Sequence, residues 1–158
     1  MFRRRRRWDP QPTDPCEVIL ASDGRQAFSE SAVARAAALS GNRPVAVVTV
    51  AKVYGSSFGL PHPGLLPTKE EVKERRGWVE DAIVRLQRDR IDADGQVAAT
   101  RRATKKLAQV AVLRGVRVVV IDETTSRGLR RVIEGDVGSE LRRKLRRRGI
   151  EVEIVPRS

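Results

Sequence analysis

Apolar residues along this chain fall in five short runs separated by longer segments with helical spacing. The runs cover residues 16–22, 44–53, 96–100, 116–122 and 150–155. The second and fourth runs are almost continuous valine, isoleucine and alanine, which is typical of strands buried on both faces of a parallel sheet. The last run alternates instead, with isoleucine or valine at 150, 152 and 154 and glutamate between them. That alternation predicts a strand at the edge of the sheet.

Four segments between these strands have apolar residues at the spacing of a helix. Their apolar faces run over residues 28–39, 72–86, 103–111 and 133–145. Thr68 and Glu71 form a capping box that predicts the start of the second helix. Glycines at 41, 115 and 149 mark the ends of the other three. Strand and helix therefore alternate, which predicts an α/β fold: an open, doubly wound, five-stranded parallel sheet with helices on both faces.

Ligands of such sheets bind outside the carboxyl ends of the strands, where the strand order reverses. Asp23 and Gly24 follow the first strand, and an aspartate there can hydrogen-bond a ribose or an adenine amine. Alternatively, Asp23 turns the chain and helps to cap the following helix. The loop at 54–67 contains His62, the only histidine of the chain. Without a cysteine or a second histidine as partner, His62 predicts neither a metal site nor a Ser/His/Asp arrangement.

Basic residues are abundant, with a formal net charge of +12. Residues 1–15 combine five arginines with three prolines and predict a disordered basic tail, so the folded domain is expected at 16–158. High positive charge favours nucleic acid or anionic membranes as partners. Here the charge is spread over several helices, and the cluster at 142–148 complements the dipole of the last helix. A nucleic-acid partner is therefore not expected, and a basic binding module is kept as an alternative.

The lengths of the apolar runs bear on the cellular location of the chain. None approaches the roughly 20 residues of a membrane-spanning helix, and no apolar segment follows the N-terminal arginines. We therefore expect no membrane span, no secretory signal and a cytoplasmic location. Cys16 is the only cysteine, so the chain has no internal disulfide.

The loop after the fourth strand, residues 122–136, has the most distinctive sequence. It contains Arg-Gly-Leu-Arg-Arg at 127–131, then Gly135 and a helix, and in this it resembles the universal stress protein family. The resemblance extends over residues 16–155, with Asp23 and Gly24 after the first strand and Val50 where the family's second strand ends beside adenine. It implies an adenine nucleotide alpha hydrolase-like fold, a regulatory stress-response role and a homodimer formed through residues 150–155.

The same resemblance implies an adenine-nucleotide site. Its residues here are Asp23, Val50, Gly135 and Val137. In members that bind ATP, the loop reads Gly, two residues, Gly, nine residues, Gly, then Ser or Thr, so that backbone N–H groups and a helix N-terminus meet the phosphates. This chain departs from that pattern at Asp122, Thr125 and Asp136. A carboxylate close to a phosphate repels it by ~1 kcal/mol in water and by more in a drier pocket, and Asp136 is expected to cap the helix itself.

These departures leave three hypotheses open. In the first, ATP binding is lost or weakened and the chain is a non-enzymatic regulatory homodimer without a cofactor. In the second, AMP, cyclic AMP or another adenylate binds, because fewer phosphates are repelled. The third is the basic module. Arg127 and Arg130 either contact an anion or balance the carboxylates of the loop. An enzyme is not expected, because no acid and base are paired at a strand end.

Overall fold

A computed structural model describes residues 14–53, 67–123 and 136–157. Its strands are β1 (Val18–Ala21), β2 (Val45–Lys52), β3 (Ala93–Thr100), β4 (Val118–Asp122) and β5 (Glu151–Val155). Its helices are α1 (Glu30–Ser40), α2 (Lys69–Arg88), α3 (Ala103–Leu113) and α5 (Val137–Arg146). Each predicted strand and helix is present, and Ile133, predicted on the apolar face of the last helix, lies outside the described residues. The third strand begins at Ala93, ahead of the predicted 96–100. The predicted start was too late because Asp94 and Gly95 interrupt the apolar pattern of this strand.

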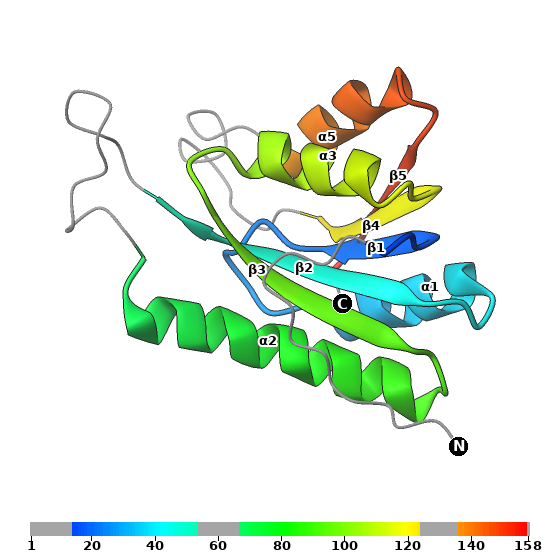
Figure 1. Ribbon diagram of the computed structural model, residues 1–158, viewed down its shortest axis with the longest axis horizontal. Helices are drawn as coiled ribbons and strands as arrows, with labels where there is room; N and C mark the ends of the chain where they lie inside the picture. Colours follow the sequence, from blue (N-terminus) through cyan, green and yellow to red (C-terminus); the bar gives the residue numbers. More distant parts are fainter. Residues whose placement is uncertain (1–13, 54–66, 124–135, 158) are drawn as a thin grey trace.

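All five strands are parallel, in the order β3-β2-β1-β4-β5. Helices α1 and α2 cover one face of the sheet, and α3 and α5 cover the other (Figure 1). The predicted doubly wound fold is therefore confirmed. β5 lies at one edge, as the alternating pattern predicts. β1 lies at the centre, and the order reverses between β1 and β4, which is where ligands of such sheets are expected.

The core consists of two layers, one on each face of the sheet. Alternate residues of β1 divide between them: Ile19 and Ala21 pack beneath α3 and α5, whereas Val18 and Leu20 pack beneath α1 and α2. Burying each large aliphatic side chain stabilises the fold by ~1.5–3 kcal/mol. One helical prediction is wrong: Val72, expected on the apolar face of α2, is 37% exposed, because the buried side of this helix begins only at Val79.

Side chains cap three helix starts, and the sequence indicates two of them, Thr68 and Asp136. Thr68 accepts a hydrogen bond from the backbone N–H of Glu71 at the start of α2. Ser29 caps α1 in the same way, and Asp136 caps α5. α3 differs, because Arg102 at its N-cap makes no side-chain capping bond and its first turn has no acidic residue. Three of the four helix starts in the described ranges are thus closed by the chain itself.

A buried ion pair joins α3 to β3 at the amino-terminal ends of the strands. Arg114 is 1% exposed and donates two hydrogen bonds of 2.6 Å to the carboxylate of Asp94. Its Nε also donates to the backbone carbonyl of Asp14 at 2.7 Å. Cys16 lies close by, and burial raises the pKa of its thiol to about 11. The predicted tail lies almost wholly outside the described residues, so its disorder stays a prediction.

Candidate functional site

A cleft of about 550 Å³ opens at the carboxyl ends of β1, β2 and β3. Its described lining residues are Asp23, Gly24, Arg25, Val50, Lys52, Arg75, Thr100, Arg101, Arg102, Ala103, Thr104, Lys105, Val137, Glu140 and Lys144. Three predicted site residues, Asp23, Val50 and Val137, are therefore brought together. The others, Gly135, Thr125, Arg127 and Arg130, lie outside the described residues, and Asp122 and Asp136 do not line this cleft.

Asp23 shapes the turn that follows β1. Its Oδ1 accepts a hydrogen bond of 3.0 Å from the backbone N–H of Arg25, and its Oδ2 lies 3.8 Å from Nε of the same arginine. Ser22 supports the turn by accepting from the N–H of Gly24 at 3.1 Å. The alternative role as a turn residue is thus present, but the cap of α1 is Ser29 rather than Asp23. The Asp23 carboxylate still borders the cleft.

Gly24 allows this turn to lie directly against β2. Its φ is +85°, and a Cβ atom there would lie 2.1 Å from the carbonyl oxygen of Val50. Both the left-handed backbone and the close approach require glycine. One wall of the cleft is therefore built by backbone contact between Gly24 and Val50. The only sign of this contact in the sequence is the glycine directly after Asp23.

Beside Asp122, at the ends of β1 and β4, the described residues leave little open space. Only about 10 Å³ is left there, bordered by Ser22, Asp23, Gln26, Ile121, Asp122, Glu123 and Arg157. Asp122 accepts hydrogen bonds from the backbone N–H of Ser29, at 3.0 Å, and from its hydroxyl. Arg157 lies 3.3 Å from the same carboxylate and donates to the carbonyl of Ala27 at 2.8 Å. Asp122 thus ties the end of β4 to the start of α1.

Asp136 accepts hydrogen bonds at the start of α5. It accepts from the backbone N–H of Gly138 at 3.1 Å and from the hydroxyl of Ser139 at 2.7 Å. This is the capping role expected from the sequence. The repulsion expected from Asp122 and Asp136 assumed free carboxylates, whereas both receive hydrogen bonds, and Asp122 also has a cationic partner. Their effect on an anion in the cleft is reduced accordingly.

The open cleft is strongly basic. Among its described lining residues, seven are Lys or Arg and two, Asp23 and Glu140, are acidic. Glu140 accepts a hydrogen bond of 3.0 Å from the hydroxyl of Thr104, which links α5 to α3. Sequence reasoning missed this charge because its residues come from distant segments. The available signal was a pair of arginines, Arg101 and Arg102, directly after the carboxyl end of a strand.

No protein-family model matches the chain, and no curated protein matches it. Solved structures do match. A universal stress protein in complex with cAMP is 18% identical over 92% of this chain and 99% of that chain, with a TM-score of 0.62. A protein of the universal stress protein family from Burkholderia pseudomallei is 19% identical over 88% and 94%, with a TM-score of 0.58.

The universal stress protein from Archaeoglobus fulgidus in complex with dAMP is 17% identical over 88% of this chain and 96% of that chain, with a TM-score of 0.52. These likenesses cover 88–92% of this chain. The chain has the universal stress protein fold. The resemblance seen over residues 16–155 is thus supported by similarity of fold, at 17–19% sequence identity.

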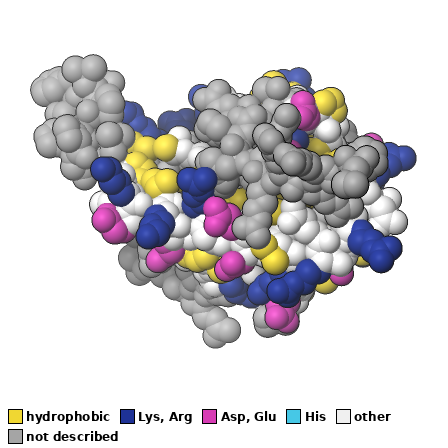
Figure 2. Space-filling model, turned by 60° about the horizontal axis from the view of Figure 1, so that its bottom comes forward, with side chains coloured by type: hydrophobic (Ala, Val, Ile, Leu, Met, Phe, Trp, Pro, Cys, Tyr) yellow, Lys and Arg dark blue, Asp and Glu magenta, His cyan; other side chains and the backbone are white. Residues whose placement is uncertain are grey.

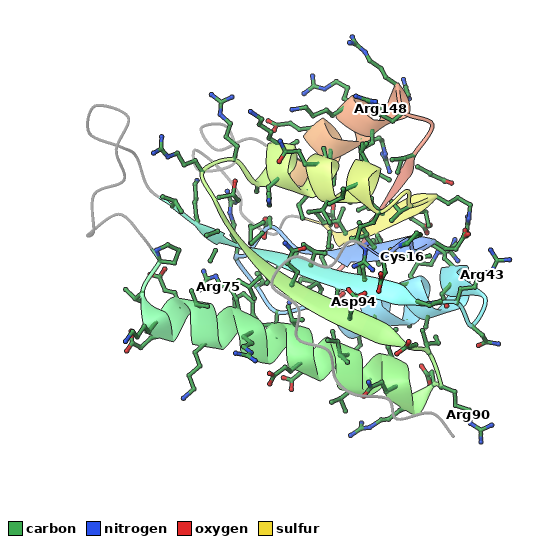
Figure 3. All side chains as sticks on the ribbon, in the orientation of Figure 1. Cys16, Arg43, Arg75, Arg90, Asp94 and Arg148 are labelled. Carbon is green, nitrogen blue, oxygen red and sulfur yellow. The ribbon has the colours of Figure 1, made fainter. Side chains whose placement is uncertain are left out.

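Within this universal stress protein fold, the basic residues of α5 point mainly away from the cleft. Arg143, Arg146, Arg147 and Arg148 are exposed, and Arg148 extends outward beyond the end of the helix (Figure 3). On the face shown in Figure 2, Lys and Arg side chains alternate with Asp and Glu. Mixed charge of this kind is typical of a solvated surface.

Two further classes of site are absent from the part of the chain that the structure describes. No group of three or more His, Cys, Asp or Glu side chains is placed to hold a metal ion. No helix in the described ranges has the length and apolarity required to span a membrane. The basic cleft is therefore the candidate functional site of the described residues.

Proposed function

We propose that this chain is a non-enzymatic regulatory protein of the universal stress protein type that binds an adenine nucleotide in the basic cleft. The observation that carries the proposal is that the cleft, at the carboxyl ends of β1 to β3, brings Asp23, Val50 and Val137 together. These residues lie 27 or more positions apart in the sequence, so only the fold could join them. Matched structures that hold cAMP and dAMP support the choice of an adenine nucleotide.

Each of these residues has a chemical role in the proposal. The Asp23 carboxylate, 17% exposed at the cleft, accepts a ribose hydroxyl. Val50, against which Gly24 packs, gives an apolar surface for the base. Val137, in the first turn of α5, closes the opposite side. The departures at Asp122, Thr125 and Asp136 support the prediction that ATP is not held in the family's usual manner.

Calorimetric titration with adenosine, AMP, cyclic AMP and ATP tests the proposal. We expect saturable binding, and a ligand at 100 times its dissociation constant should stabilise the fold by ~2.7 kcal/mol. Asp23→Asn should weaken binding, whereas Asp81→Asn on the exposed side of α2 makes the same charge change and should not. Absence of binding at millimolar nucleotide would contradict the proposal. Turnover of the bound nucleotide would contradict its non-enzymatic part.

We also propose a homodimer formed through β5. This strand is at the edge of the sheet and, by its pairing with β4, leaves the peptide groups of Val152 and Ile154 on the open side. Unpaired edges of this kind favour strand pairing across a two-fold axis. The Val152 carbonyl already accepts hydrogen bonds from Arg142 at 3.0 and 3.1 Å, so that side chain competes with a partner strand. A monomeric mass by light scattering at micromolar concentration would exclude the dimer.

A further inference from the structure

We infer that the cleft binds the phosphate groups of a nucleoside di- or triphosphate at a cation subsite formed by Arg102, Lys105 and Lys144. The inference deepens the proposed function, on which its nucleoside part rests. It places the phosphates beside α3 and α5, away from the loop that follows β4. The binding groups are side-chain cations rather than the backbone of a glycine-rich loop.

The cation subsite joins two helices that pack against each other. Arg102 precedes α3, Lys105 lies in its first turn, and Lys144 of α5 lines the same cleft. The bond from Thr104 to Glu140 fixes the two helices in this arrangement. Across the described ranges, Arg102, Lys105 and Lys144 have no ion-pair partner. Three uncompensated cations around one cleft attract a multivalent anion, and concave walls concentrate that attraction.

Arg75 adds a second, independent observation from the α2 side of the same cleft. Its side chain lies between α2 and the sheet (Figure 3), and its Nε is buried without an acceptor among the described residues. The guanidinium is held by a cation–π contact, with its Cζ 5.3 Å from the centroid of the Trp78 ring. Its Nη1 also donates a 3.4 Å hydrogen bond to the Glu71 carbonyl and lies 3.5 Å from the Glu74 carboxylate, so among the described residues only Nε is buried without an acceptor. A buried N–H donor is normally satisfied. An anionic oxygen in the cleft would satisfy this one.

The usual phosphate position near the start of α5 is less suitable in this chain. Asp136 already takes the N–H of Gly138 there, and its carboxylate adds negative charge. The start of α3 has the opposite character, with no side-chain cap, no acid in its first turn and basic residues at 101, 102, 105 and 106. Within the cleft, the electrostatic preference for phosphate therefore lies on the α3 side.

A charge-matched pair of double variants tests the subsite. Lys105→Gln with Lys144→Gln removes two cations from the cleft, and Lys106→Gln with Arg143→Gln removes two from the same helices outside it. Each variant is titrated with adenosine, AMP, ADP, ATP and inorganic triphosphate, after its unfolding curve shows that it is folded. For the unmodified chain we expect affinity to rise from AMP to ATP, and triphosphate to compete with ATP.

We expect the cleft variant to lose about 10- to 100-fold in ATP affinity, as for two charge-assisted contacts, and to change AMP affinity far less. The control variant should stay within about threefold. Equal affinity for AMP and ATP, or equal losses in both variants, would overturn the subsite. Binding of triphosphate without binding of adenosine would support the subsite and refute the adenine proposal. Binding of adenosine and AMP with no gain in affinity for ADP or ATP would support the adenine proposal and refute the subsite. Binding of duplex DNA through the cleft in preference to ATP would also overturn it.

Discussion

The carboxylate of Asp122, at the end of β4, accepts hydrogen bonds from both the backbone N–H and the hydroxyl of Ser29, the N-cap of α1. The two residues are 93 positions apart in the chain. Aspartate thus occupies a position where ATP-binding members of the resembled family have glycine, and here it has a structural role. It ties the end of β4 to the start of α1, and the space beside it is only about 10 Å³, whereas the basic cleft has about 550 Å³.

Asp122→Ala should reduce the free energy of unfolding by ~1–3 kcal/mol, because the N–H of Ser29 and the guanidinium of Arg157 lose their acceptor. Denaturant unfolding measures the change. Glu123→Ala is the control, since this exposed neighbour carries the same charge. Equal small effects from both substitutions would show that the Asp122 contacts contribute nothing.

Gly24→Ala should disrupt the wall of the cleft, because the added methyl group would lie 2.1 Å from the Val50 carbonyl oxygen. We expect a loss of more than ~2 kcal/mol in stability, together with weaker nucleotide binding. Gly77→Ala in α2 meets no atom within 4 Å and should instead raise stability by ~0.5–1 kcal/mol. Thermal unfolding of the two variants compares them directly; a fully stable Gly24→Ala protein would refute the close approach.

Arg114→Met should be among the most damaging single substitutions, because it leaves the Asp94 carboxylate without its cation. Breaking a buried pair by removing one partner costs ~3–5 kcal/mol. Arg117→Met tests an exposed arginine 3.4 Å from Glu17 and should cost less than ~1 kcal/mol. Both values come from denaturant curves, and a similar cost for the two would argue against the buried pair.

The thiol of Cys16 should make stability fall in alkaline solution. Burial raises its pKa to about 11 in the folded chain, whereas an unfolded cysteine titrates near ~8.5. Between these values the unfolded chain holds fewer protons than the folded one, so the free energy of unfolding decreases as pH rises. Cys16→Ala should remove that part of the slope between pH 8.5 and 11. Parallel pH profiles for the two proteins would contradict the assignment.

Arg142→Met should strengthen the proposed dimer. The substitution keeps an apolar stem but removes the two hydrogen bonds to the Val152 carbonyl on the open side of β5. That carbonyl then becomes available to a second strand. Sedimentation at a series of concentrations should give a lower dissociation constant than for the unmodified chain. If both proteins are monomeric at every concentration, β5 does not form the interface.

Local patterns were sufficient to predict most of the fold. The apolar runs, the N-cap at Thr68 and the glycine at 41 depend on neighbouring residues, and the structure has each of them. Of the predicted capping box, the structure shows the bond from the Glu71 N–H to Thr68. Val72 was misplaced because helical spacing alone cannot show where a long helix extends past its packing partner. The edge position of β5 followed from its alternation.

The candidate site was less predictable, because it depends on contacts between distant segments. Asp23 was indicated by its position after the first strand, and Val50 only by the family resemblance. The cation subsite joins Arg102 to Lys144, and no local pattern links them. No local pattern links Asp122 to its partner Ser29. Asp122 was therefore interpreted as a free charge beside a phosphate.

Mapping backbone amide shifts by NMR during titration with AMP tests the central claim most directly, because it reports both binding and position. We expect saturable shifts at Gly24, Val50 and Val137 around the cleft, with little change at Cys16 and Asp94 at the opposite end of the sheet. No shifts at millimolar AMP, or shifts centred away from the cleft, would contradict that claim.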